Sequence, residues 1–390
     1  MEIMDKQTPS EILHEASLKM DAYRTLDPRK SEEFNQYYVT RPHAEAPGLI
    51  LESQRAHKSG RPFHWFFTGH TGSGKSTELN RLRENSKLTE NYFPLYIDFT
   101  EGVPEKRVVE IDYTEIILEM AVACVGIAEE RGCRFSKDLA EYIENWRKHA
   151  QLEKEVFHET QGDAGIKLGA WFGWLREQIK SGGKTRKIFR ESLYDDVNRF
   201  IELIDKLVEE VENSFNRKAL VIIDGMDHID VKPCEDLFTN YYLTLTRPRL
   251  SKIFIVPLYL LNTRFRSTIQ GRSSTLCNIK VFSKQCSEKL DPEGFKFYKD
   301  LVSRYISLEF FEEEALDSLF RLSAGLVRDM IRLTADACGR AHIDGADKVS
   351  TDHVEEIWNQ EMRYFQDVLD EAHYPLLERI EENPKPKGLE

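Results

Sequence analysis

Short apolar runs separated by polar stretches dominate the first three quarters of this 390-residue chain. Residues 219–223 are apolar without interruption and end at Asp224, which is typical of a strand buried on both faces of a sheet. The aromatic run at residues 63–67 also predicts a short buried strand. Three further strands are predicted, at residues 92–99, 253–256 and 277–282. Pro94 lacks a backbone N–H, so we expect the pairing of its strand to start late.

Apolar positions at helical spacing lie between these strands. Residues 111–130 carry one such face, formed by Ile116, Ile117, Met120, Ala121 and Val125. Helices are also predicted at residues 10–23, 77–83, 135–150 and 192–213. Residues 162–183 contain several glycines and give no clear prediction. Strands that alternate with helices indicate an α/β fold, a parallel sheet with helices on both faces.

The pattern changes near the C-terminal quarter. From residue 288 onward it is mainly helical, so we place a domain boundary near residue 287. The predicted parts are an N-terminal helical segment (1–60), an α/β core (61–287), an all-helical domain (288–380) and a flexible tail (381–390).

Composition limits the class of protein. The 67 acidic residues outnumber the 54 Lys and Arg, and the net charge of −13 argues against a general polyanion binder. The six cysteines are scattered without a C-x-x-C pair, which indicates reduced thiols. The N-terminus lacks an apolar signal segment, and the longest apolar run, residues 253–261, is about half of a membrane span. We therefore expect a cytoplasmic protein without a membrane partner.

The acidity is uneven along the chain. Residues 237–287 contain no Asp or Glu but eight Lys or Arg. A second basic cluster at residues 176–190 is opposed only by Glu177. Two interpretations stay open for both stretches: solvated surface, or an anion site for nucleotide phosphates, a neighbouring subunit's nucleotide or nucleic acid.

The segment from Gly69 to Ser76 matches the phosphate-loop pattern G-x-x-x-x-G-K-[ST]. Glycines let backbone N–H groups approach crowded phosphate oxygens, Lys75 brings a positive charge to the β and γ phosphates, and Ser76 offers a hydroxyl to Mg²⁺. A helix that begins at the loop aims its dipole at the anion. The predicted phosphate-binding set is Gly69, His70, Thr71, Gly72, Ser73, Gly74, Lys75, Ser76 and Thr77.

A second acidic element follows the buried strand that ends at Asp224. Ligands of open α/β sheets bind at the carboxyl edge, so we expect Asp224 to hold Mg²⁺ together with Ser76. Asp227 lies three residues further on and is the predicted group that orients or deprotonates the attacking water. His228 is the rival base; a lone loop histidine is more often solvated, which favours Asp227.

The two motifs lie far apart in sequence. Lys75 and Asp224 are 149 positions apart, whereas one strand and two helices need roughly 50–60 residues. The excess predicts a mostly helical insertion within residues 103–195. We expect its aromatic pair, Trp171 and Trp174, to pack in a core rather than stack on a base.

Four segments together resemble bacterial ATPases on the border of the AAA+ and STAND (signal-transduction ATPase) groups. They are GHTGSGKSTEL (69–79), VIIDGMD (221–227), FIVPLYLL (254–261) and SAGLVRDMIRL (323–333). The last also looks like the lid of the origin-recognition ATPases. The resemblance covers about residues 35–375. It implies a five-stranded P-loop sheet, in which the Asp224 strand is not adjacent in sequence to the Gly69 strand, followed by a helical lid.

The resemblance also implies site residues beyond the two motifs. Arg328 matches the lid arginine that touches the γ-phosphate, and Gly325 permits the tight turn before its helix. Residues 38–42 lie where the family grips adenine, so Val39 and Arg41 are implied contacts.

This chain departs from the family pattern in two places. Ala324 stands where such lids often have glycine, and Pro257 and its neighbours follow the fourth strand where AAA+ members place a polar sensor. Asn262 or Arg264 are possible substitutes. Arg264, Arg266 and Arg272 lie near the place of an AAA+ arginine finger that acts across a subunit interface; plain surface charge is the equal alternative.

The function implied by the resemblance is an ATP-dependent, Mg²⁺-dependent regulatory switch that hydrolyses ATP. A role in bacterial anti-phage defence, a separately encoded effector and a homo-oligomer are implied as well. The alternative is a DNA-binding AAA+ ATPase of initiator or transposition-regulator type, with nucleic acid bound through residues 237–287. A third hypothesis is a protein that binds ATP only structurally.

Overall fold

The computed structural model of the chain describes residues 7–42, 46–100, 111–150, 168–180, 184–269, 271–283 and 289–382. Backbone contacts divide it into two compact units. The helical unit comprises residues 1–43, 72–74 and 278–390, and the sheet unit comprises residues 44–71 and 75–277. The boundary between the two units lies between Cys277 and Asn278, and residues 1–43 belong to the same unit as the C-terminal helices.

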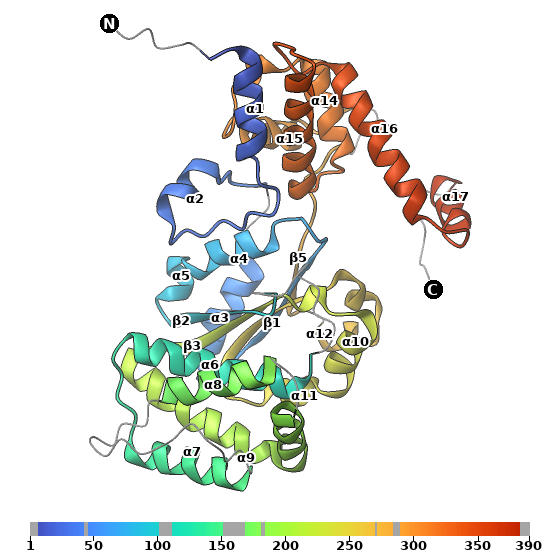
Figure 1. Cartoon of the computed structure of the whole chain (residues 1–390). Helices are drawn as coiled ribbons and strands as arrows, with labels where there is room; N and C mark the ends of the chain where they lie inside the picture. The colour runs from blue at the N-terminus through green and yellow to red at the C-terminus, as the bar shows by residue number, and fades with distance from the viewer. Residues whose placement is uncertain are drawn as a thin grey trace, which may run out of the picture. The chain divides into compact units, whose positions relative to one another are not determined.

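A parallel five-stranded sheet organises the sheet unit (Figure 1). The strand order is β2-β3-β4-β1-β5. The strands are β1 (His64–Gly69), β2 (Tyr92–Asp98), β3 (Lys218–Asp224), β4 (Ser251–Val256) and β5 (Ser273–Leu276). β4 lies between β1 and β3, so the strands of the two motifs are neighbours neither in sequence nor in the sheet.

Both faces of the sheet are buried. Along β3, Val221 and Ile223 enter one hydrophobic cluster, while Leu220 and Ile222 enter another on the opposite face. The first cluster is closed by helices that follow β2 and β3, and the second by helices on either side of β1. The continuous apolar runs therefore belong to strands buried on both faces, as predicted, and the predicted α/β class is confirmed.

Two strand predictions were wrong in detail. β2 pairs with β3 from Tyr92 onward, so Pro94 does not delay pairing; β2 is an edge strand, and only one side of it needs N–H donors. Residues 277–282 form no strand. Their buried side chains, Ile279 and Val281, belong to the core of the helical unit, and the fifth strand is the more polar segment just before them.

Helices supply the rest of the sheet unit. They are α3 (Pro47–Ser59), α4 (Lys75–Arg83), α5 (Ser86–Thr89), α6 (Tyr113–Glu130), α7 (Lys137–His149), α8 (Leu168–Lys180), α9 (Lys184–Phe215), η2 (Met226–His228), α10 (Val231–Asn240), α11 (Tyr242–Thr246), η3 (Leu258–Asn262) and α12 (Arg266–Ile269). α9 is kinked at Asp196. Where it is described, the predicted insertion is helical; residues 103–110, 151–167 and 181–183 lie outside the described residues. Trp171 is buried in the core of the sheet unit and Trp174 packs against the same core, partly buried, so both belong to a core as expected.

The second basic cluster is part of an internal ion-pair network. Arg186 and Arg190 both contact Glu115, at 2.8 and 2.7 Å, and Arg176 contacts Glu119 at 2.7 Å. Both glutamates lie on α6 and are buried. These three arginines neutralise buried carboxylates, whereas Lys180, Lys184 and Lys187 of the same cluster are exposed, so an anion site at residues 176–190 would depend on the lysines.

The helical unit consists of α1 (Pro9–Lys19), α2 (Ser31–Tyr37), α13 (Pro292–Val302), η4 (Leu308–Phe310), α14 (Glu313–Leu322), α15 (Val327–Ile343), α16 (Thr351–Val368) and α17 (Tyr374–Glu382). α1 packs along α15 (Figure 1). Together with α13 and α14 these helices form a hydrophobic core. The predicted tail lies outside the described residues from position 383 onward. Among the described residues, no helix has the length and apolarity needed to cross a membrane.

The turn before α15 depends on two left-handed residues. Ala324 has φ +48° and Gly325 has φ +77°. A Cβ on Gly325 would lie 1.9 Å from the carbonyl oxygen of Ile279, so only glycine fits there. Ala324 adopts a conformation that glycine favours, which explains why a glycine at this position would be the less strained choice.

A buried lysine lies near the start of β4. The Lys252 side chain is fully buried, and its Nζ donates to the carbonyl oxygens of Thr246 (3.4 Å), Pro248 (2.7 Å) and Leu250 (2.9 Å). Burial lowers the pKa of Lys252 to about 7, against a smaller opposite effect of the Asp205 carboxylate.

This lysine predicts a pH-dependent stability. Between about pH 7 and 8.5 the folded chain loses the Lys252 proton while the unfolded chain keeps it, so the free energy of unfolding should rise by about 2 kcal/mol. Below pH 7 both states hold the proton and the full cost of burying the charge remains. Urea titrations at the two pH values measure the rise, and Lys252→Met should abolish it. An equal rise in Lys252→Met would assign the effect to another group.

Candidate functional site

The phosphate-loop motif connects β1 to α4. Gly72 and Gly74 have φ of +87° and +91°, the left-handed region that favours glycine. Lys75 begins α4 and is 6% exposed. Its Nζ donates to the carbonyl oxygens of Gly69 (3.1 Å) and His70 (3.0 Å). The ammonium is therefore folded back over the loop that contains it.

The Lys75 ammonium also forms an ion pair with Asp227. Nζ lies 2.8 Å from Asp227 Oδ2, and both side chains are nearly buried. Asp227 is in the short helix η2, which follows Gly225. Gly225 has φ +87°, and a Cβ there would lie 2.9 Å from the Thr100 side chain. This glycine therefore makes possible the sharp turn that returns Asp227 to the loop lysine.

Asp224 ends β3 as a buried carboxylate. Tyr96 donates its hydroxyl to Asp224 Oδ2, and the backbone N–H of Gly225 donates to Oδ1 at 2.7 Å. Burial raises the pKa of Asp224; hydrogen bonds from Ser76 and Tyr96 oppose that rise. Ser76 and Asp224, 148 positions apart in sequence, thus share one site.

Two residues of β2 join this site that sequence reasoning missed. Burial and the neighbouring Asp224 raise the pKa of Tyr96 well above its ordinary value, so its hydroxyl stays a donor. Asp98 is the register partner of Asp224, and it accepts from the Thr100 N–H (2.7 Å) and hydroxyl (2.6 Å). Asp98 could have been predicted as a site residue, because it ends a strand and the carboxyl ends of parallel strands meet at one edge of a sheet. That prediction would have required knowing that β2 lies beside β3.

The other predicted residues belong by contacts to the helical unit, including positions 72–74. Arg41 is buried, and its Nη1 donates to the Ser73 carbonyl at 2.6 Å. The Arg328 N–H donates to the Gly72 carbonyl at 3.0 Å, and its guanidinium lies 5.1 Å from the ring centre of Tyr23.

Val39, the other implied adenine contact, packs against the core of the helical unit. The remaining loop side chains differ in exposure. His70 and Thr71 are exposed, whereas Ser73 is fully buried.

The residues present fit a Mg²⁺-bound polyphosphate. Carboxylate and hydroxyl oxygens are the donors Mg²⁺ prefers, and Asp224 and Ser76 supply one of each. Lys75 supplies the charge that a phosphate chain requires, and α4 begins at this point. Asp227 supplies a second carboxylate beside the lysine. A carboxylate there can act as a general base toward a water near the phosphate chain.

The three candidate finger arginines surround the connection between β4 and β5. Arg264, Arg266 and Arg272 are all exposed. Arg264 and Arg266 line an open hollow of about 860 Å³ together with Asn262. Among the described residues, neither Arg264 nor Arg266 forms an ion pair.

No protein-family model matches this sequence, and no curated protein matches it significantly. Many solved structures are similar, among them the following three. Drosophila ORC bound to DNA has 11% identity and a TM-score of 0.41, covering 91% of this chain and 68% of that chain. Aeropyrum pernix ORC1 in complex with DNA has 12% identity and a TM-score of 0.45, covering 89% and 74%. A Walker-type ATPase of Pyrococcus abyssi has 12% identity and a TM-score of 0.36, covering 86% and 80%. Similarity at this level does not carry function from one protein to another.

Proposed function

We propose that this chain binds and hydrolyses ATP with Mg²⁺ and acts as a nucleotide-dependent switch. One observation carries the proposal: the Lys75 ammonium contacts Asp227 at 2.8 Å, while Ser76, the next residue, is close enough to Asp224 to lower the pKa of that carboxyl. A phosphate-binding cation, a hydroxyl, a metal-binding carboxylate and a candidate base therefore meet at the carboxyl edge of β1 and β3. No other reaction class accounts for all four groups as simply.

The contacts of Lys75 suggest how binding prepares the reaction. Its ammonium now donates to two loop carbonyls and to Asp227. Phosphate oxygens would compete for this ammonium and release Asp227 from its ion pair. The freed carboxylate would take a proton from water as the water oxygen bonds to the γ-phosphorus and the bond to the ADP oxygen breaks. Binding and base activation would thus be coupled through one lysine.

Ser76 and Asp224 would hold Mg²⁺, which neutralises charge on the β and γ phosphate oxygens. Tyr96 occupies Asp224 Oδ2 through its hydroxyl, and so orients the carboxylate. We assign Tyr96 a positioning role and Asp98 the role of a second acidic neighbour.

The switch part of the proposal concerns the helical unit. Arg328 is the proposed γ-phosphate contact and Val39 and Arg41 the proposed adenine contacts, as the resemblance implies. Loss of the γ-phosphate would remove the anion that Arg328 binds, which is how hydrolysis would reset the switch. Control of a separate effector in anti-phage defence stays an expectation from the resemblance alone.

Asp224→Asn tests the metal part of the site. The amide oxygen can still accept from the Gly225 N–H, and the amide NH2 can donate to the Tyr96 hydroxyl oxygen, so the variant should fold and bind ATP in EDTA as the wild type does. The gain in ATP affinity on adding Mg²⁺ should vanish, and turnover should fall by about 100-fold or more, because the metal-holding charge is gone. Calorimetric titration with and without Mg²⁺ and a phosphate-release assay measure both. Asp236→Asn, on the exposed side of α10, is the matched control. Retention of the Mg²⁺ effect in Asp224→Asn would remove Asp224 from its role.

A DNA-binding AAA+ ATPase is the second candidate function. The described part of the acid-free stretch favours it, since Arg264, Arg266 and Arg272 are exposed there. Its signature is a DNA affinity that falls steeply with salt.

A further inference from the structure

The C-terminal end of the helical unit exposes an unusual number of large apolar side chains. Within residues 358–377 they are Trp358, Met362, Tyr364, Phe365, Val368, Tyr374, Leu376 and Leu377, each between 38% and 63% exposed. Figure 1 shows α16 running out beyond the other helices of its unit, with α17 beside its end. We call these side chains the α16–α17 surface. Eight large apolar side chains exposed within 20 residues indicate a contact with a partner.

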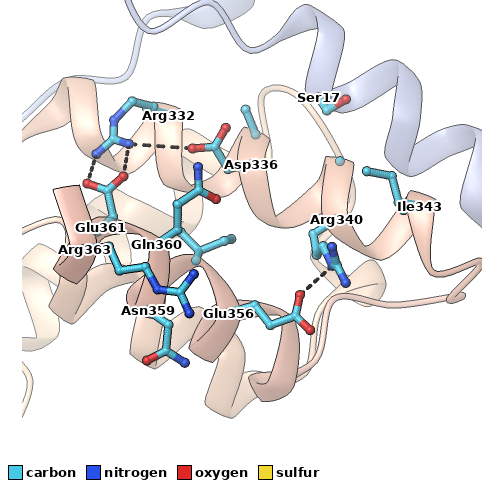
Figure 2. A pocket seen from close by; sticks show the side chains of 13 residues that line it. Ser17, Arg332, Asp336, Arg340, Ile343, Glu356, Asn359, Gln360, Glu361 and Arg363 are labelled. Carbon is cyan, nitrogen blue, oxygen red and sulfur yellow. Dashed lines mark hydrogen bonds and ion pairs between the residues drawn. The ribbon is translucent and has the colours of Figure 1, made fainter.

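The surface is distinct from the neighbouring groove between α15 and α16. That groove encloses about 840 Å³ and is lined by charged side chains that pair with each other (Figure 2). Arg332 forms two hydrogen bonds with Glu361, and Arg340 pairs with Glu356. Most of the charged side chains in the groove are therefore paired with each other, and Arg363 is the exception among the described residues of its lining. The apolar positions Trp358, Met362 and Phe365 instead follow i, i+4, i+7 spacing along one face of α16.

Charge defines what can cover this surface. Residues 351–382 contain ten Asp or Glu and two Arg, a net charge of −8; Glu356 and Glu361 pair with Arg340 and Arg332 of α15, and the segment stays acidic without these two. Nucleic acid and anionic membrane would be repelled by such a segment. The occupant must instead offer positive charge beside apolar area.

The chain itself carries a complementary surface. The hollow beside Arg264 and Arg266 has no acidic residue in its lining, and the partly buried Leu261 adds apolar area, whereas Ile269 is buried beneath it. It lies inside the stretch of residues 237–287 that lacks Asp and Glu altogether. Nothing in the described residues neutralises these two arginines, so an acidic apolar helix from another molecule fits the site.

We propose that the α16–α17 surface of one copy docks on the Arg264–Arg266 hollow of a second copy. The two faces differ, so the contact is head-to-tail. An open assembly then keeps a free α16–α17 surface at one end and a free Arg264–Arg266 hollow at the other. Such a contact closes into a ring or grows as a filament. Arg264 and Arg266 then serve the subunit contact by charge. The inference does not depend on ATP hydrolysis.

The test uses the full chain and measures mass by light scattering after size exclusion. The wild type should self-associate at low salt and dissociate as salt rises. Met362→Ser with Phe365→Ser removes one face, and Arg264→Glu with Arg266→Glu removes the other. Each double variant alone should be monomeric, with association weakened at least about tenfold. All four side chains are exposed, so folding should be kept, and melting curves check it. If a double variant melts early, the single changes Phe365→Ser and Arg266→Glu carry the same test.

Mixing the two double variants gives the sharpest result. Each retains the face that the other lacks, so an equimolar mixture should form a dimer and nothing larger. A wild type that stays monomeric at all salt concentrations, a double variant that still associates, or a mixture that stays monomeric overturns the proposal. DNA binding gives one more decisive outcome. If Arg264→Glu with Arg266→Glu loses binding of duplex DNA but still self-associates, the hollow is a nucleic-acid site and the proposal is overturned.

Discussion

Lys75→Ala is expected to abolish ATP binding. The ammonium donates to two loop carbonyls and lies 2.8 Å from Asp227, so it is fixed where a phosphate chain would meet the loop. Hydrogen bonds to a charged group are each worth about 1.5–3 kcal/mol. Loss of two such bonds between the Lys75 ammonium and phosphate oxygens should weaken ATP binding by about 100-fold or more. Calorimetric titration of the purified chain with ATP and Mg²⁺ measures this loss.

Lys87→Ala is the matched control, because Lys87 is an exposed lysine on the adjacent helix α5. It should bind ATP as the wild type does. Lys75→Ala also leaves Asp227 nearly buried without its cation, so the ATP-free variant should lose about 3–5 kcal/mol of stability. A folded Lys75→Ala protein with wild-type ATP affinity would refute the phosphate-binding role.

The parts of the site that follow from local sequence were predicted, and the parts that follow from strand order were not. The loop glycines and Lys75 form one short motif, and Asp224 follows an uninterrupted apolar run. The ion pair between Lys75 and Asp227 depends on where β4 lies between β1 and β3, and on the turn at Gly225. Neither is visible in residue spacing. Tyr96 was missed for a similar reason, since an aromatic residue in a strand predicts packing before it predicts a hydrogen bond.

The wrong fifth strand shows a second limit of pattern reasoning. Buried Ile279 and Val281 alternate with exposed residues, as strand residues do, but they pack in the core of the helical unit. The true edge strand β5 consists mostly of serine and threonine, and only Leu276 is buried. Alternation reports burial on one side of an extended segment. It does not report whether the neighbour is another strand.

The basic stretches show a related limit. Charge along the sequence does not distinguish arginines that neutralise buried glutamates, such as Arg186 and Arg190, from exposed ones such as Arg264 and Arg266. Only the fold separates them. The internal ion pairs tie α6 to α8 and α9, whereas the exposed arginines are free to serve a partner.

Asp227→Asn is expected to keep ATP binding and lose turnover. The amide has the shape of the carboxylate but accepts no proton from water, and general-base catalysis is worth about 10²–10⁴-fold in rate. The ion pair gives this variant a second readout. Lys75 loses its anionic partner in a nearly buried position, so the ATP-free protein should unfold more easily, and ATP should restore more stability than it does in the wild type.

His228→Gln separates Asp227 from its rival, because His228 Nε2 lies 3.9 Å from Asp227 Oδ1 and is the other proton acceptor beside it. Phosphate release and thermal shift, each with and without ATP, are measured on both variants. Loss of turnover in Asp227→Asn alone assigns the base to Asp227, whereas loss in His228→Gln alone would assign it to His228. The thermal shift separates these outcomes from loss of binding: a variant that ATP still stabilises has kept the Lys75 contact with phosphate, so its defect lies in the chemical step.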